Sequence, residues 1–399
     1  MTAHDVLHLD AIALTPEMQA LQEQLLTCIQ CGSCAGTCPT AWAMDVTPRY
    51  LWRLVQAGAL DEVLNTRTFW LCASCYSCSV VCPRDLVPSD IMLRLRSLVM
   101  AGQGGQAPEP MVAFGQTIAA HHNITGDSPE ARLMWSANLS PVPEGLRRKA
   151  GAEVLYFVGC VSSLYPASYR IPQAFVQTLD SIGVDFTTLA EEEWCCGYPL
   201  INAGRDEEVA RFAAHNVSQV FDLGVRLVVL TCPPCYHMWK HVYPEVYPQA
   251  REVEVLHATE YLARLIAEGQ LEMGEVEITV TYHDPCDLGK KSGVYDAPRY
   301  VLTHIPGVKL VEMVRSREAS WCCGGGGNLE VSEREVSQDV ATRRLRQAQA
   351  TGAAAIVSAC QQCKRTLAGA ARANKVRMRV MDVVELVWKA VESRPSSET

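Results

Sequence analysis

The 18 cysteines of this chain fall into four clusters, which form two motifs that each occur twice. The first motif is C-x2-C-x2-C-x3-C-P, and its two copies are Cys28, Cys31, Cys34, Cys38 and Cys72, Cys75, Cys78, Cys82. The second motif is a single cysteine, a Cys-Cys-Gly and a C-x2-C, with the copies Cys160, Cys195, Cys196, Cys232, Cys235 and Cys286, Cys322, Cys323, Cys360, Cys363. Thiolates at such fixed intervals hold inorganic clusters, so the sequence predicts a protein that moves electrons.

The first motif is the bacterial ferredoxin run, in which three cysteines bind one [4Fe–4S] cluster and the fourth binds a second cluster. The two cubane clusters then have the ligand sets Cys28, Cys31, Cys34, Cys82 and Cys72, Cys75, Cys78, Cys38. A C-x2-C pair also suits tetrahedral zinc. Three close thiols with a distant fourth, duplicated and each run followed by proline, favour iron.

Each copy of the second motif offers five cysteines, one more than a cubane cluster needs. Adjacent cysteines such as Cys195 and Cys196 have diverging side chains, so one backbone segment can serve two irons or bridge them. The extra thiolate indicates a larger or more open cluster. The C-x2-C pairs follow apolar runs and are expected where helices begin, because amide donors and the helix dipole favour thiolate there.

Other chemistries fit the pattern less well. Disulfides rarely persist in a reducing cytosol, and three thiols at x2 spacing lie too close together to find separate partners easily. Cys232 and Cys235 have the spacing of a thioredoxin-like redox pair, yet they belong to the five-cysteine motif. The run Gly324–Gly327 could cradle a phosphate, but no Gly-Lys-Ser/Thr follows it.

Residues 1–100 carry the first pair of motifs and are predicted to be helical. Thr47 has the character of an N-cap and Pro48 that of a first helical residue. The apolar positions that follow keep helical spacing, with Gly58 as a tolerated break. A second helix is predicted over 89–100.

Residues 101–150 join this region to the rest of the chain. The stretch 101–110 is rich in glycine and proline, which is typical of a linker. Helical patterns follow over 111–121 and 129–135, with a turn between them.

From residue 151 short apolar runs alternate with helical patterns, which indicates parallel sheets. Each apolar run ends shortly before a cysteine of the second motif; the runs are 154–158, 227–230, 278–282 and 354–357. Helices are predicted over 172–182, 206–223 and 332–351.

Equivalent cysteines of the two copies are 126, 127 and 128 positions apart, which indicates a duplication. The predicted fold is an α-helical two-cluster ferredoxin domain followed by two duplicated α/β domains with parallel sheets, related by pseudo-twofold symmetry. The predicted boundaries are 1–100 for the ferredoxin domain, 101–150 for the linker and connecting helices, 151–273 for the first α/β domain and 274–399 for the second, with its C-terminal helix.

The composition is that of an ordinary globular protein, with 48% hydrophobic residues and a net charge of −9, which makes nucleic acid a poor partner. The first residues lack the basic and apolar regions of a secretory signal. The longest apolar runs are too short to span a bilayer. We therefore expect a cytoplasmic protein that reaches a membrane only through a partner subunit.

Several segments resemble heterodisulfide reductases. CIQCGSCAGTCP, MDVTPRYLWRLVQAG and WLCASCYSCSVVCPRD are similar to the ferredoxin module of the C subunit, and the five-cysteine repeats resemble the cysteine-rich CCG domains of the B and D subunits. HNITGDSPEARLMW resembles the Asn-x-x-Gly…Arg-x-x-Trp stretch of the D subunit, in which a C-like module precedes a B-like tandem. The resemblance extends over about residues 20–390.

This resemblance implies a function. In heterodisulfide reductases each complete repeat binds a noncubane [4Fe–4S] cluster, and a disulfide is cleaved between the two clusters with one electron from each. Both repeats here keep five cysteines, so the resemblance implies two noncubane clusters with the ligands Cys160, Cys195, Cys196, Cys232, Cys235 and Cys286, Cys322, Cys323, Cys360, Cys363.

Two roles are compatible with the resemblance. In the first, the chain is an oxidoreductase subunit that reduces or forms a small disulfide, with a b-type cytochrome membrane subunit or a flavoprotein as redox partner. In the second, it is an electron relay without a substrate of its own, linking a flavoprotein dehydrogenase (glycolate, lactate or electron-transferring flavoprotein) to the quinone pool. Complete cysteine sets in both repeats favour the first role.

A few other residues are candidates for chemistry. His283 and His237 lie near cluster cysteines, and either could donate a proton to a leaving thiolate or simply hydrogen-bond to backbone or sulfur. Lys290 and Lys291 could attract an anionic substrate, although a solvated charge pair is the simpler interpretation. The predicted tail helix over 380–391 could contact a membrane subunit or pack on its own domain.

Overall fold

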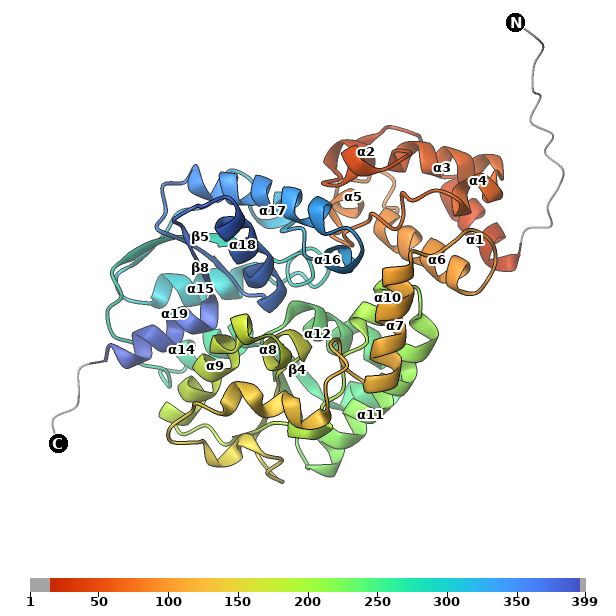
Figure 1. Ribbon diagram of the computed structural model, residues 1–399. Helices are drawn as coiled ribbons and strands as arrows, with labels where there is room; N and C mark the ends of the chain where they lie inside the picture. The colour runs from red at the N-terminus through yellow and green to blue at the C-terminus, as the bar shows by residue number, and fades with distance from the viewer. Residues whose placement is uncertain (1–14, 395–399) are drawn as a thin grey trace, which may run out of the picture.

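The computed structural model describes residues 15–394. Figure 1 shows a helical N-terminal part in red and orange, a first α/β half from yellow through green, and a second α/β half in cyan and blue. None of the helices within 15–394 combines the length and the apolar character that a membrane crossing requires. The expectation about a secretory signal concerns residues 1–14, which lie outside the described range.

The N-terminal part consists of short helices around its own apolar core. They are α1 (Pro16–Leu25), α2 (Ser33–Thr37), the 3-10 turn η1 (Ala41–Ala43), α3 (Pro48–Ala57), α4 (Leu60–Leu64), α5 (Ser77–Val80) and α6 (Pro88–Met100). Helix α3 begins as predicted, because Thr47 Oγ1 accepts a hydrogen bond from the Tyr50 amide. The prediction for Gly58 was wrong: with φ 75° it ends α3 instead of lying inside a helix.

Helix α7 (Glu109–His121) leads from the helical part into the α/β halves. It packs against α10 (Tyr198–Asn202) of the first half and α16 (Leu329–Ser332) of the second, so it touches both. Two 3-10 segments follow, η2 (Pro129–Ser136) and η3 (Glu144–Leu146). The helix predicted over 129–135 therefore exists, but with 3-10 geometry.

The first half contains a four-stranded parallel sheet in the order β2-β1-β3-β4. Its strands are β1 (Val154–Phe157), β2 (Phe186–Thr187), β3 (Leu227–Leu230) and β4 (Glu254–His257). Its other helices are α8 (Cys160–Leu164), η4 (Pro166–Ser168), α9 (Arg170–Ser181), η5 (Ala190–Glu192), η6 (Asp206–Glu208), α11 (Val209–Asp222), α12 (Pro233–His237), the π-helical turn η7 (Met238–Val242), α13 (Tyr243–Val246), η8 (Pro248–Glu252) and α14 (Ala258–Ala267).

The second half contains a parallel sheet in the equivalent order β6-β5-β7-β8. Its strands are β5 (Ile278–His283), β6 (Val308–Leu310), β7 (Ala355–Ser358) and β8 (Arg379–Asp382). Its other helices are α15 (Asp296–His304), η9 (Arg317–Ala319), α17 (Arg334–Gln349), α18 (Gln361–Ala373) and α19 (Val383–Glu392).

The four predicted strands are the inner strands β1, β3, β5 and β7, whose side chains are almost all buried. The outer strands β2, β4, β6 and β8 were not predicted. The predicted tail helix starts too early, since its first residues belong to β8 and the helix itself is α19. Helix α19 packs against α9 of the first half and α15 of its own, and so ties the two halves together.

Candidate metal centres

The ten cysteines of the second motif lie beyond the carboxyl ends of the four inner strands. Cys160 follows β1, Cys232 follows β3, Cys286 follows β5 and Cys360 follows β7, each within three residues of the strand end. Carboxyl ends of parallel strands share one edge of a sheet, where ligand sites form. All ten cysteines line a single cavity, and each is at most 8% exposed.

In the first half the five thiols form a continuous group. Cys160 contacts Cys195, which is next to Cys196, and Cys196 contacts Cys235, which contacts Cys232. The residues that resembled a redox pair, Cys232 and Cys235, are therefore part of a set of five. We call these five cysteines the first site.

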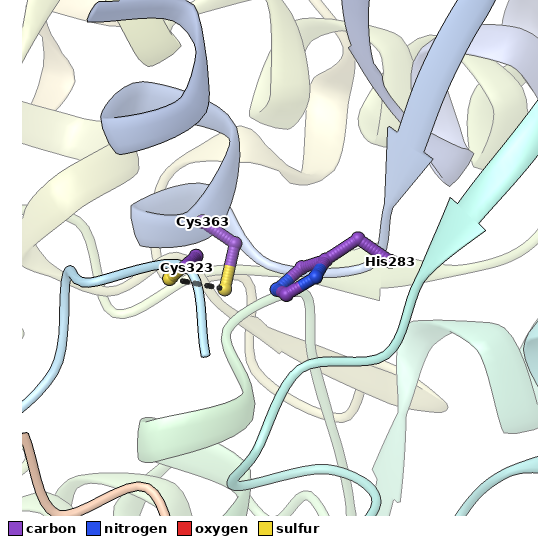
Figure 2. A group of neighbouring side chains, drawn as sticks. All are labelled: His283, Cys323 and Cys363. Carbon is purple, nitrogen blue, oxygen red and sulfur yellow. Dashed lines mark hydrogen bonds between the residues drawn. The ribbon is translucent and has the colours of Figure 1, made fainter. Parts of the chain in front are cut away.

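In the second half the equivalent thiols gather in the same way. Cys286 contacts Cys322, and Cys363 contacts Cys360. The sulfurs of Cys323 and Cys363 are 3.3 Å apart, as the dashed line in Figure 2 marks. We call these five cysteines the second site.

His283 lies at the end of β5 and its imidazole ring points toward the second site (Figure 2). Its Nδ1 accepts a hydrogen bond of 3.0 Å from Arg344 Nε, and a ring nitrogen lies within 4.8 Å of the sulfurs of Cys323 and Cys363. Burial lowers the pKa of His283, so the ring is neutral at pH 7 and carries its proton on Nε2. His237 has a different neighbour, since its Nδ1 lies 3.4 Å from the Ser292 hydroxyl.

The ferredoxin-type cysteines occupy two further cavities in the helical part. One is lined by Cys28, Cys31, Cys34 and Cys82, and the other by Cys38, Cys72, Cys75 and Cys78. The structure thus brings the last cysteine of each run to the first three of the other run. The second of these cavities is the one that faces the α/β halves, because Cys75 contacts Cys322 of the second site.

So many thiols cannot all ionise unaided in a buried space. Burial raises the pKa of Cys38 to about 12. Hydrogen bonds from Cys322 and Cys363 hold the pKa of Cys323 well below its usual range. A thiolate in such a set is stabilised by neighbouring thiols that must keep their protons in order to donate to it. A bound metal cation allows these remaining thiols to lose their protons as well. A donor set made of sulfur alone suits iron–sulfur clusters.

Glycines after the second Cys-Cys pair allow the helical part to approach the second site. A Cβ on Gly327 would lie 2.1 Å from the Cys72 carbonyl oxygen, and one on Gly326 would lie 2.4 Å from that of Ala73. Ala73, Cys75 and Cys322 belong to one small apolar cluster. The glycine run therefore serves close backbone packing.

The interpretation of Lys290 and Lys291 as a solvated pair was wrong, because both make hydrogen bonds to other parts of the protein. The Nζ of Lys291 lies 2.9 Å from Asp287 Oδ1, donates to Tyr198 and to Ser74 of the helical part, and its side chain is only 5% exposed. The Nζ of Lys290 donates to Ser77 Oγ and to the Ser320 carbonyl. Both lysines contact Ser74 or Ser77 because the helical part docks here, which no local pattern reveals.

Two buried arginines also escaped prediction. Arg96 donates to five backbone carbonyls, among them Cys72 of the helical part, Asn202 of the first half and Gly327 of the second. Arg132 donates to the sulfur of Cys160. Arg132 lies in the segment whose pattern resembled the D subunit of heterodisulfide reductases, and that pattern was the only signal for it.

Comparisons with known proteins agree with this arrangement. A family model described as 4Fe-4S dicluster domain matches residues 24–86. A model described as cysteine-rich domain matches twice, over residues 154–240 and 280–368. A protein of Helicobacter pylori, solved as a hypothetical protein, aligns with 96% of this chain and 74% of its own at TM-score 0.59, but at 10% identity it indicates fold alone.

Curated relatives are similar over nearly the whole chain. The D subunit of dihydromethanophenazine:CoB--CoM heterodisulfide reductase from Methanosarcina mazei is 34% identical, covering 94% of this chain and 97% of its own. EtfAB:quinone oxidoreductase of Syntrophomonas wolfei is 31% identical over 85% of this chain but only 48% of its own. With a dicluster domain ahead of two cysteine-rich domains and this identity, the chain belongs to the family of heterodisulfide reductase D subunits, as an iron–sulfur oxidoreductase subunit.

Proposed function

We propose that this chain is the iron–sulfur subunit of a heterodisulfide-reductase-like complex. Two cubane clusters pass electrons to two noncubane [4Fe–4S] clusters, which reduce a small disulfide or, in reverse, form one from two thiols. The cubane ligands are Cys28, Cys31, Cys34, Cys82 and Cys72, Cys75, Cys78, Cys38, and the noncubane ligands are the cysteines of the first and second sites.

The proposed organisation follows the cysteine motifs. Residues 1–100 form a helical ferredoxin domain, 101–150 connect it to the rest, and 151–273 and 274–399 are CCG domains related by a pseudo-twofold axis. The equivalent strand orders of the two sheets support this division. The sharing of one cavity by two five-cysteine sites supports the pseudo-twofold relation.

One observation carries the proposed reaction: ten cysteines from both halves surround one cavity. A disulfide in this cavity meets both sites at once. Breaking its S–S bond consumes two electrons and two protons and gives two thiols, so two one-electron sites on either side match the stoichiometry. The clusters supply the electrons when bound, and the protein supplies the enclosure.

The chain's own side chains shape that enclosure. Phe114, Ile124, Val161 and Val331 contribute apolar wall, which excludes water and favours an uncharged S–S group. His283 remains a predicted proton donor. Its neutral ring can donate a hydrogen bond from Nε2 toward the second site, where a thiolate is newly formed.

The contact between Cys75 and Cys322 supports an order of electron transfer. A cluster held by Cys28, Cys31, Cys34 and Cys82 would accept electrons from a partner, because Cys31 is exposed. A cluster held with Cys75 would then lie between it and the second site.

The partner in this proposal is a b-type cytochrome membrane subunit or a flavoprotein, at the cytoplasmic face of the membrane. An electron relay from a flavoprotein dehydrogenase to quinone is the alternative. The similarity to EtfAB:quinone oxidoreductase favours it, although this chain spans about half the length of that relative.

The test is an assay of anaerobically purified chain with small disulfides and an artificial reductant such as reduced viologen. Disulfide-dependent oxidation of the reductant is the expected result, with roughly 16 irons per chain from four clusters. A full iron content without turnover of any disulfide, together with copurification of a flavoprotein dehydrogenase, would establish the relay instead. An iron content near eight would mean that the two sites hold no clusters.

A further inference from the structure

The connecting segment between the helical part and the first half builds one wall of the first site. Asn123 folds a tight turn in it: its Oδ1 accepts hydrogen bonds from the amides of Thr125 and Gly126, and its Nδ2 donates to the Asp127 carbonyl. Asn123 is only 2% exposed. The turn directs the following 3-10 segment η2 against α8, the helix that begins with Cys160.

Arg132 on η2 brings a buried positive charge to the first site. Its side chain is 3% exposed, and its Nη2 donates to Cys160 Sγ over 3.2 Å and to the His122 carbonyl, also over 3.2 Å. Its Nη1 lies 2.8 Å from Glu193 Oε1. A charge-assisted hydrogen bond of this kind is stronger than a neutral one and is oriented by the planar guanidinium.

Glu193 holds Arg132 in place from the side away from the sulfur. Its two oxygens also accept hydrogen bonds from the Val158 and Gly159 amides, at 2.8 and 2.9 Å. Glu193 is 3% exposed. Because these amides hold the carboxylate, the positive end of the buried pair stays directed at Cys160. Burying an ion pair is costly, and this pair is placed so that its cation donates to a sulfur of the first site.

No arginine or lysine within residues 15–394 donates to a sulfur of the second site, and the buried guanidinium of Arg344 acts on Cys286, Cys323 and Cys363 only through space. The residue that duplicates Glu193, 127 positions later, is Ser320. Within residues 15–394 the sulfurs of the second site accept hydrogen bonds from the amides of Gly324, Gly325 and Cys363, and from no arginine or lysine. The nearest guanidinium, that of Arg344, donates to His283 instead.

We infer that Arg132 makes the first site the stronger electron acceptor of the two, so that electrons delivered at the second site move on to the first. Reduction adds negative charge to a site, and a fixed cation that donates to one of its sulfurs stabilises the reduced form. The low dielectric of the buried site strengthens this effect. One electron leaves the second site and one enters the first, with no proton transferred. The inference rests on the proposed function, since it requires a redox cluster at each site.

The experiment is a redox titration monitored by electron paramagnetic resonance, on the full chain with its clusters. The first variant, R132K, keeps the positive charge but loses the planar guanidinium with its two donor nitrogens. The second is the double variant R132Q/E193Q, which leaves no buried carboxylate without a partner. R299K is the matched control, because Arg299 forms a buried pair with Asp284 in the second half and donates to no sulfur. Signals are assigned to sites with C196S and C323S.

At a fixed potential near its midpoint, the first site of R132Q/E193Q should show an about tenfold lower ratio of reduced to oxidised cluster, equal to about 59 mV for a one-electron couple. R132K should lie between it and the wild type. The second site and the cubane clusters should keep their potentials, as should all clusters of R299K. If the double variant does not fold, the midpoint potential of the first site in R132K is compared with that of the wild type instead.

Unchanged potentials at the first site, or equal shifts at both sites, would overturn the inference and leave Arg132 a structural residue. Wild-type protein without iron at either site would overturn the proposed function instead. Iron analysis of every sample separates these two failures.

Discussion

The two α/β halves share a strand order and a cysteine pattern but differ in what surrounds their cysteines. The first site receives a direct hydrogen bond from Arg132, which comes from the connecting segment. The second site faces His283 and touches Cys75 of the helical part. Both differences come from outside the repeat or from positions where the repeats diverge. Duplication thus produced two similar sets of ligands, and their surroundings made the sets unequal.

The residues that follow the two Cys-Cys-Gly sequences also differ between the halves according to what packs against them. In the first half Leu200 is fully buried in an apolar cluster with Cys160 and Cys195. The equivalent residue of the second half is Gly327, because the Cys72 carbonyl takes the space that a side chain needs. A leucine there would push the helical part away. The close approach of the helical part to the second half therefore depends on glycine at this position.

The largest effect is expected from emptying one site at a time. C196S and C323S each remove a sulfur from one site, and each should lose about four of roughly 16 irons. Disulfide reduction should fall more than about 100-fold in both, since each site supplies one electron. Iron analysis and spectra of the reduced protein would check this. Loss of the cubane signals in either variant would contradict the ligand assignment.

A smaller effect is expected where the helical part meets the second half. G327A puts a Cβ against the Cys72 carbonyl at a residue with φ 65°, whereas G352A has a similar φ of 72° with nothing within 4 Å. Both lose about 1 kcal/mol to backbone strain. G327A should lose about 2 kcal/mol more, because a buried backbone contact must open. Urea unfolding would measure both, and equal losses would mean that the contact is loose.

The smallest effect is expected at two helix caps that occupy equivalent places in the two halves. His257 caps α14 and Asp382 caps α19, and each has a glutamate at the third helical position. Burial lowers the pKa of His257 to about 3 and raises that of Asp382 to about 8. In the unfolded chain the pKa of His257 returns to about 6.5 and that of Asp382 to about 3.9. Stability linked to His257 is therefore lost as pH falls from 6.5 toward 3, and stability linked to Asp382 is lost as pH rises from 4 toward 8.

Asparagine keeps both caps without titrating. In the wild type, His257 lowers the free energy of unfolding by about 1 kcal/mol for each pH unit below 6.5, and H257N should abolish this decrease. Asp382 causes a similar decrease as the pH rises above 4, which D382N should abolish. Urea unfolding at pH 5, 6, 7 and 8 would check the opposite signs. Parallel pH profiles for the two variants and the wild type would show that neither cap titrates in this range.

Sequence patterns predicted the inner strands because their apolar runs are buried whatever lies beyond them. They missed outer strands such as β6, Val308–Leu310, whose residues are only partly buried or exposed. Such strands form because a neighbour offers hydrogen bonds. Gly58 was misjudged for a related reason: a glycine inside a helical pattern and one that ends a helix look alike until the following residues find their contacts.

In the candidate site, too, residues with local patterns could be recognised from the sequence and residues with distant partners could not. All 18 cysteines could be named from their spacing, since x2 and Cys-Cys-Gly intervals act within one turn of backbone. Lys291 could not be recognised as buried, because Ser74 and Tyr198, its partners, lie 217 and 93 positions away. The carbonyls that bind Arg96 are similarly scattered along the chain.

The sequence by itself determined which residues are candidate metal ligands and how often the pattern repeats, because these properties depend on spacing along the backbone. Only the tertiary structure decided that ten of these cysteines share a cavity, that Cys75 touches Cys322, and that Arg132 reaches one site and not the other. Those contacts join segments far apart in the chain. They depend on how whole elements pack, which no local interval encodes.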